Sequence, residues 1–378
     1  MTTNSQVTDF WAGLLKLSPD SPDHKSEAKV FALDNLGVLT VSGLDAATFL
    51  QGQVTVDVES MADGTGAMAG HCDHKGRLNS NFFLLRNSQT DFSLVLHQDV
   101  AEFAQQALAK YAVFSKCEVT NDSDSLAVIA CDDPEALDSL VVSCKTADTD
   151  CNPSNLGSLI SPASESVDVN NSNLLLLIDV ANLQNPGKLI EALSEFNFAN
   201  SQQWAQRRIC AGVALLKAGQ LSKHIPQMLN MDQLGAISWT KGCYTGQEVV
   251  ARLHYRGSSN RRLFLFELCN ITATDFADFL SSAEQATILN EEGKAIGDIV
   301  DWSTGDPNTY TGLAVVKLRE ALKLTASHSS DERNTLQGMA LQCAVGFQDK
   351  KLPARLLAPP YISMEELLNV SEQDSKPQ

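Results

Sequence analysis

The sequence predicts a mixed α+β fold of several subdomains that ends in a small β-barrel. Helix-like and strand-like runs alternate as far as residue 260, whereas the runs after Asn260 are nearly all strand-like and are separated by turn residues. The 378 residues exceed the usual size of one hydrophobic core, and the apolar content of 43% is ample for burial. Length alone therefore favours two or three packed domains.

The N-terminal part begins with about 25 residues rich in Pro, Ser and Asp, which we expect to be a lightly ordered lead-in. Residues 30–41 alternate as in a hairpin that turns at Asp34-Asn35, and a capped helix then runs from Ser42 to Gln51. The further elements expected up to residue 142 are strands over 81–85, 92–96 and 126–130, a helix from Asp99 to Lys110, and a helix that opens at Asp133-Pro134.

Residues 143–173 are rich in Ser, Asp and Asn and contain few large apolar side chains, so we expect a surface insertion there. Structure should resume after it. The elements expected from there on are a strand over 174–180, helices over 186–196 and 201–216, and strands over 261–268, 286–289, 296–302, 311–316 and 341–347.

Charge and cysteine content limit the function. A net charge of -18 argues against broad binding of nucleic acid, because phosphate contacts need clustered Lys and Arg. The nine cysteines are scattered with no C-x-x-C pair, which is untypical of a disulfide scaffold. The longest purely apolar run, 174–178, is too short to cross a bilayer, and no basic leader begins the chain. We expect a soluble protein of a reducing cytoplasm.

The segment Lys241-Gly242-Cys243-Tyr244-Thr245-Gly246-Gln247-Glu248 is the candidate chemical centre. Thr245 and Glu248 have the spacing of a capping box, which predicts a helix start at about Thr245. Cys243 would then lie beside unpaired amides and the positive end of the helix dipole, with Lys241 close by, and each of these favours a thiolate. A buried, inert thiol is the plainer alternative.

Charges after this segment stand out from the acidic chain. Glu248, Arg252 and Arg256 recur at intervals of four and share one helix face. Residues 241–262 contain five basic residues and one acid, Glu248. The five are Lys241, Arg252, Arg256, Arg261 and Arg262. Such a cluster could hold a polyanionic ligand tail or a few phosphates, although a solvated helix face would look the same.

The run KGCYTGQEVVAR resembles the signature of the YgfZ-type folate-binding proteins, which are related in fold to the aminomethyltransferase (T protein) of the glycine cleavage system. The similarity spans roughly residues 33–262. Further matching segments are Gln51-Gly52-Gln53-Val54-Thr55 with Asp57, His71-Cys72-Asp73 with Lys75-Gly76, residues 110–116, residues 201–204 and Ile225-Pro226-Gln227.

The resemblance implies three subdomains around a central channel for tetrahydrofolate or a derivative, with the motif cysteine near its opening. Of two tryptophans that contribute to folate binding in the family, Trp204 matches one and Leu36 replaces the other. The expected divisions are a flexible lead-in (1–28), an N-terminal α+β subdomain (29–120), a ferredoxin-like α+β subdomain with a disordered insertion at 143–173 (121–200), a helix and cysteine-motif segment (201–260) and a C-terminal β-barrel (261–378).

The candidate catalytic residues are Lys241, Cys243, Tyr244, Gln247 and Glu248, and the candidate folate-binding residues are Trp204, Arg252 and Arg256. Glu248 could simply cap the helix, and Trp204 could simply be core. Arg207 and Arg208 are further candidates for the folate's glutamate tail. No zinc-like spacing accompanies His71, Cys72 and His74, so no metal site is expected. No recognised motif pairs Cys243 with a histidine as in cysteine hydrolases.

By this resemblance the protein is a folate-binding accessory factor that supports iron–sulfur enzymes, including those that thiolate or methylthiolate tRNA. Cys243 would take part in a redox, sulfur or one-carbon exchange with a client. Two alternatives stay open: a folate-dependent aminomethyl- or methyltransferase, and a direct tRNA-binding protein that uses the basic cluster. We expect weak or indirect contact with tRNA and none with DNA or a membrane.

Overall fold

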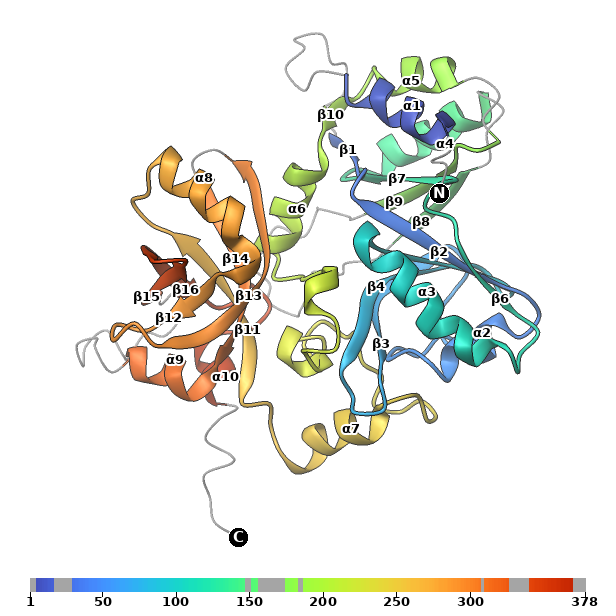
Figure 1. The fold of residues 1–378 in the computed structure, drawn as a ribbon. Coiled ribbons are helices and arrows are strands. Elements are labelled where there is room, and N and C mark those ends of the chain that lie inside the picture. The colour runs from blue at the N-terminus through green and yellow to red at the C-terminus, as the bar shows by residue number, and fades with distance from the viewer. Residues whose placement is uncertain are drawn as a thin grey trace.

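The computed structural model describes residues 5–16, 29–146, 151–155, 174–182, 186–306, 309–325 and 340–369. It contains one ten-stranded mixed sheet and one closed barrel of six strands, with a helical and looped segment between them (Figure 1). Within the described residues, no helix combines the length and apolar character that a membrane crossing requires. The mixed fold with a C-terminal barrel agrees with the sequence prediction.

The large sheet has the strand order β10-β1-β7-β9-β8-β3-β4-β5-β2-β6. Its pairs are antiparallel except β1 with β10 and β3 with β8. The strands are β1 (Lys29–Ala32), β2 (Leu36–Ser42), β3 (Thr65–Cys72), β4 (Leu78–Ser88), β5 (Asp91–His97), β6 (Glu118–Asn121), β7 (Leu126–Cys131), β8 (Cys151–Asn155), β9 (Leu174–Asp179) and β10 (Asn197–Ala199).

Helices cover this sheet in two groups, each over its own buried cluster. Apolar residues of α1, α4 and α5 pack near β1, β7 and β9, and those of α2 and α3 pack on β2 to β5. Figure 1 shows the two groups at the upper and lower ends of the sheet. The helices are α1 (Ser5–Leu14), α2 (Ala46–Gln51), α3 (Gln98–Ala112), α4 (Pro134–Thr146) and α5 (Pro186–Leu193).

The barrel closes in the order β11-β14-β13-β12-β15-β16, and every pair is antiparallel. Its interior and the helices around it share a separate core. The elements are β11 (Arg261–Leu268), α8 (Ala273–Ser282), the 3-10 turn η3 (Ala283–Gln285), β12 (Thr287–Leu289), β13 (Ala295–Asp306), β14 (Thr309–Lys317), α9 (Leu318–Thr325), β15 (Leu341–Phe347), β16 (Lys350–Leu357) and α10 (Met364–Asn369).

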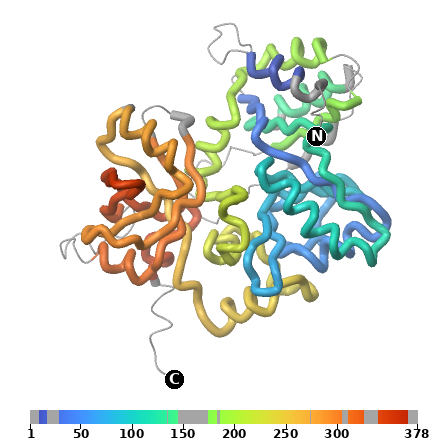
Figure 2. Tube along the Cα trace, in the orientation of Figure 1, coloured from blue at the N-terminus to red at the C-terminus, as the bar shows by residue number. Residues whose placement is uncertain are grey.

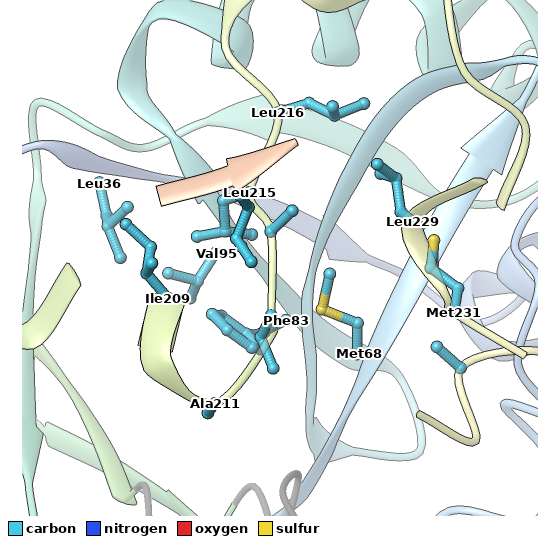
Figure 3. Close-up of a cluster of buried hydrophobic side chains, with 14 of the residues drawn as sticks. Leu36, Met68, Phe83, Val95, Ile209, Ala211, Leu215, Leu216, Leu229 and Met231 are labelled. Carbon is cyan, nitrogen blue, oxygen red and sulfur yellow. The ribbon is translucent and has the colours of Figure 1, made fainter. Parts of the chain in front are cut away.

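Residues 201–256 run between the sheet and the barrel (Figure 2). This segment holds α6 (Ser201–Cys210), η1 (Ala218–Gln220), η2 (Pro226–Leu229) and α7 (Gln247–Arg256). Its apolar side chains join those of both units in the central core, where Leu36, Phe83 and Val95 of the sheet approach Ile209 and Leu215 (Figure 3). This shared core fixes the loop between η2 and α7, which carries Cys243.

Several local expectations were wrong. β1 and β2 do not form a hairpin, because β1 pairs with β7 and β10 while β2 pairs with β5 and β6. The expected lead-in contains α1, whose Phe10 and Leu14 are fully buried. The expected insertion at 143–173 contains the end of α4 and all of β8, which lies inside the sheet. Residues 17–28, 147–150 and 156–173 lie outside the described part.

Candidate functional site

Cys243 is exposed on a loop, residues 241–246, that is anchored on both sides of the thiol. On one side, Lys241 is buried and its Nζ donates to the main-chain oxygens of Val54, at 2.9 Å, and Val56. On the other, Tyr244 is 7% exposed. The Lys241 ammonium lies 5.4 Å from the centre of the Tyr244 ring, within the range of a cation–π contact. The loop therefore presents a thiol to solvent from a fixed backbone.

Burial sets the protonation behaviour of both anchors. Desolvation lowers the pKa of Lys241 to about 8, although Asp57 and Glu59 oppose this. Desolvation also raises the pKa of the Tyr244 hydroxyl well above its usual range. Lys241 thus serves as a buried donor to two carbonyl groups, which differs from the predicted role of a cation that stabilises the Cys243 thiolate.

The helix after the loop begins differently from the prediction. α7 starts at Gln247, its N-cap is Gly246, and no side chain caps it, so the predicted capping box of Thr245 and Glu248 is wrong. Thr245 instead donates its hydroxyl to Gln53 Oε1 at 3.3 Å. Gln247 Nε2 reaches back to the carbonyl oxygen of Gly242 at 3.5 Å, and Glu248 is exposed in the first turn.

Gly246 explains why a capped start does not form. Its φ of 83° lies in the left-handed region, and a methyl group there would come within 2.5 Å of the Asp73 carbonyl oxygen and 2.9 Å of Cys72 Cβ. Only glycine lets the chain turn into α7 this close to the end of β3 and the β3–β4 turn, residues 73–77. The same turn meets α7 again where Gly76 lies against Val249.

Three of the matching sequence segments therefore meet around Cys243: residues 51–57, the β3–β4 turn and the loop itself. The amide of Thr245 donates to Gly52, and that of Ser238 donates to Thr55. His71 and Cys72 are completely buried here, where desolvation lowers the pKa of His71 to about 4 and raises that of Cys72 beyond its usual range. The part of the chain that the structure describes holds no group of three or more metal-ligating side chains.

The predicted folate-binding residues come from two helices, Trp204 from α6 and Arg252 and Arg256 from α7. Trp204 is 4% exposed in the central core, with its ring edge-on to Phe83 at 6.0 Å. Arg208 lies over the Trp204 ring and forms an ion pair with buried Asp301 at 2.7 Å, while Arg207 pairs with Asp132. Leu36 is also buried in this core.

The predicted basic cluster separates into two kinds of residue. Arg262 is buried and forms a two-pronged ion pair with Asp232 at 2.6 and 2.9 Å, and Arg261 pairs with Asp298 at 3.0 Å. Lys241 is held by its carbonyl partners. Arg252 and Arg256 are exposed on α7, and neither has an ion-pair partner among the described residues. The local charge is thus largely neutralised, except on α7.

A cavity of about 760 Å³ lies between the η1–η2 region and the wall of the barrel. The basic side chains of Arg77, Lys217, Lys223 and Arg261 line it together with the indole of Trp302 and the carboxylates of Glu284 and Asp298. Lys217 Nζ lies 3.6 Å from the centre of the Trp302 ring. These residues come from five separate parts of the chain, so no local spacing could have revealed them.

His224 adds an unused polar group to this cavity. Its Nδ1 is buried and has no hydrogen-bond partner among the described residues. Desolvation lowers the pKa of His224 to about 4, so the imidazole is neutral at pH 7. A buried nitrogen without a partner costs free energy that a bound polar ligand would recover.

The cavity and the cysteine loop share one support, the β3–β4 turn. Arg77 at the end of this turn lines the cavity and donates to the Ser222 carbonyl oxygen at 3.1 Å. The amide of Leu78 donates to His224 at 2.8 Å. The other end of the turn touches Gly246. The β3–β4 turn therefore borders both the cavity and the loop that holds Cys243.

Comparison with known proteins gives three consistent results. A family model described as the GCVT N-terminal domain matches residues 22–160. Two proteins named tRNA-modifying protein YgfZ are similar to this chain. That of Enterobacter sp. (strain 638) is 35% identical over 237 residues, which cover 62% of this chain and 70% of the relative. That of Edwardsiella ictaluri (strain 93-146) is 36% identical over 235 residues, which cover 61% of this chain and 69% of the relative.

The third result concerns the fold. The crystal structure of glycine cleavage system aminomethyltransferase T from Bartonella henselae superposes with a TM-score of 0.58 and covers 93% of this chain and 89% of that one. At 12% identity this match shows the fold alone. It confirms the predicted aminomethyltransferase-like architecture.

Proposed function

Since this chain belongs to the YgfZ family, we propose that it is a folate-binding accessory protein that supports the modification of tRNA, with Cys243 as its reactive group. Its clients are iron–sulfur enzymes that thiolate or methylthiolate tRNA, and it acts in the cytoplasm. The family membership rests on relatives that carry the name tRNA-modifying protein. The folate, the clients and the role of the thiol are the parts that need experiment.

The observation that carries the proposal is an exposed thiol on a rigid loop. Cys243 is exposed, while Lys241 and Tyr244 on either side of it are buried. A thiol that packed in the core would be protected from a client, and a thiol on a loose loop would lose orientation. The anchored loop offers both access and a fixed direction of approach.

The cavity beside the barrel fits a reduced folate. Its volume of about 760 Å³ is within the range of pockets for small ligands, roughly 300–1,000 Å³. The Trp302 indole can stack on a pterin or aminobenzoyl ring. Glu284 and the unused Nδ1 of His224 are polar partners for the pterin edge, and the cations that line the cavity are partners for glutamate carboxylates.

The protein's own residues have distinct tasks in this proposal. Trp302 orients the ring system beside Lys217, whose Nζ lies over the indole and 3.8 Å from Asp301, and Lys223 and Arg77 bind the acidic tail. A bound folate would supply a one-carbon carrier or a reductant. In this proposal, folate bound in the cavity influences the position of the Cys243 loop through the β3–β4 turn. Arg77 lies at one end of this turn, and Gly246 touches the other end.

Two measurements test the proposal. Calorimetric titration with 5-formyltetrahydrofolate should detect binding that weakens at least tenfold in a Trp302→Ala variant and in a Lys217→Gln, Lys223→Gln variant. A Lys294→Gln, Lys323→Gln variant is the charge-matched control, since both side chains are exposed away from the cavity. Equal affinity of the wild type and the three variants for folate would exclude this cavity as the folate site.

The second measurement concerns the thiol. In cells that lack the gene, wild-type protein should restore thiolated and methylthiolated nucleosides in tRNA, as quantified by mass spectrometry, and Cys243→Ser should not. Cys210→Ser is the matched control, because Cys210 is also exposed. Full restoration by Cys243→Ser would contradict the proposed role of this residue.

A turnover assay separates this role from a folate-dependent transferase. The accessory role predicts that purified protein binds methylenetetrahydrofolate without exchanging its labelled carbon with a small amine donor. Steady release of labelled product, dependent on both substrates, would instead make the protein a transferase.

A further inference from the structure

The exposed face of α7 combines two arginines with an aromatic ring. Arg252 and Arg256 are one helical turn apart, and Tyr255 is at i+3 from Arg252, so the three share a face. Tyr255 is 66% exposed, and both arginines are exposed. Glu248, one turn earlier, is the acid on this face. We call Arg252, Tyr255 and Arg256 the α7 face.

Neighbouring rings hold Tyr255 in place. The Trp239 and His254 rings stack at 3.8 Å with an angle of 8° between their planes. The Tyr255 ring lies edge-on to both, and its hydroxyl is 3.5 Å from the Trp239 carbonyl oxygen. A ring that is fixed at its edge and open to solvent is preorganised to stack on a ligand, because little rotamer freedom is lost on binding.

Further exposed cations lie on segments that contact α7. Lys75 and Arg77 lie on the turn that packs on Val249 of α7, and Arg319 lines a small groove with Leu253. In a chain of net charge -18, these cations and the α7 face form a locally basic region. An anionic partner is therefore attracted to this region and repelled by the acidic remainder of the chain.

We infer that the α7 face binds a single-stranded segment of RNA. The Tyr255 ring stacks on an unpaired base, and Arg252 and Arg256, about 6 Å apart along the helix axis, bind phosphates beside it. Bases inside a duplex already stack on their neighbours, so an exposed aromatic ring selects unpaired ones. An acidic peptide would satisfy the arginines but would leave the ring without a stacking partner.

The α7 face adjoins the cysteine loop, since Gln247 at the start of α7 contacts Gly242. A bound loop of tRNA would thus lie near Cys243, where a client enzyme could contact the RNA and the thiol together. The identity of the RNA as tRNA rests on the proposed function, but the stacking and phosphate contacts do not. Binding is measured without folate or client, and Cys243→Ser protein should bind RNA like wild type, so the two proposals can fail separately.

The test is fluorescence anisotropy with a labelled single-stranded RNA decamer, a blunt RNA duplex and an unmodified tRNA, over a range of salt concentrations. We expect the decamer and the tRNA to bind more tightly than the duplex. Tyr255→Ala should weaken binding to the decamer roughly 5- to 100-fold, and Tyr255→Phe should retain it. Arg252→Gln with Arg256→Gln should lower the slope of log affinity against log salt by about 1.4, because each phosphate contact on a single strand contributes about 0.7.

Two controls make the outcome decisive. The Lys294→Gln, Lys323→Gln variant carries the same change in net charge on the barrel and should bind RNA like wild type. Circular dichroism should show unchanged folding in every variant. The inference is overturned if the charge-matched variant loses as much affinity as the α7 variant, if Tyr255→Ala binds like wild type, or if the duplex binds as well as the decamer.

Discussion

Lys241 Nζ donates a 2.9 Å hydrogen bond to the main-chain oxygen of Val54, although the two residues are 187 positions apart in the chain. With its second bond to Val56, this ammonium ties the cysteine loop to the segment that follows α2. The lysine that the sequence suggests as a partner of the Cys243 thiol is thus a fixed part of the loop's support.

The Lys241→Met variant should therefore be less stable. It leaves two buried carbonyl oxygens without their donor, which costs roughly 1–3 kcal/mol of unfolding free energy. Urea denaturation measures this change. Lys75→Met, in the exposed part of the β3–β4 turn, should stay within about 0.5 kcal/mol of wild type. Equal stability of both variants would show that the Lys241 bonds contribute nothing net.

The same lysine predicts a pH dependence. Burial lowers its pKa to about 8, from an ordinary value of 10.5, so between these pH values the unfolded chain binds a proton that the folded chain releases. Stability rises with pH wherever the unfolded state binds more protons. The stability of wild type relative to Lys241→Met should accordingly increase from about pH 8 to pH 10.5. A difference that is flat or falls in this window would mean that the lysine keeps its ordinary pKa in the fold.

Alkylation should distinguish the cysteines by exposure. Cys210 and Cys243 are exposed, whereas Cys72, Cys131 and Cys144 are buried. In native protein, iodoacetamide should modify Cys243 first and Cys210 more slowly, because burial of its thiol raises the pKa of Cys210, and both before the buried three, as followed by peptide mass spectrometry. Cys243→Ser should remove one fast site and shift the urea midpoint little, because the side chain is at the surface. Slow modification of Cys243 would contradict its accessibility.

His71 should weaken the fold in mild acid. Its pKa is lowered to about 4 by burial, from an ordinary value of 6.5, so as pH falls through this window the unfolded chain gains a proton that the folded chain cannot accept. His71→Leu should thus make the stability profile flatter between pH 6.5 and 4. Near pH 7 the change should be small, within about 1 kcal/mol, because neither ring nitrogen has a hydrogen-bond partner among the described residues. An equally steep acid profile in the variant would assign the effect to other groups, His224 first.

The two kinds of arginine near α7 should respond differently to neutral substitution. Arg262→Gln leaves Asp232 without its ion-pair partner in a buried site and should lower the unfolding free energy by about 3 kcal/mol. Arg252→Gln on the exposed helix should change it by less than about 0.5 kcal/mol. Thermal unfolding of both variants measures these changes. Similar losses of stability in the two variants would show that the buried ion pair of Arg262 and Asp232 contributes no more than exposed Arg252.

Much of the local structure could be predicted from sequence because it depends on neighbouring residues. Asp133 accepts hydrogen bonds from the amides of residues 135 and 136, as the Asp-Pro helix start indicates. The barrel strands follow the alternation of their apolar residues. The capping box at Thr245 was wrong for a tertiary reason: the close approach of Asp73 requires glycine at position 246, and the left-handed turn there shifts the helix start by two residues.

The sequence by itself determined the family, through segments that match it locally, and the mixed fold with its barrel. It also identified the loop around Cys243 as the candidate site. Only the tertiary structure decided that Arg261 and Arg262 are neutralised by Asp298 and Asp232, while Arg252 and Arg256 remain exposed. It also brought Arg77, His224 and Trp302 to one cavity. The physical reason is that charge pairing, burial and cavity walls depend on distances between residues far apart in the chain, which periodicity and spacing do not encode.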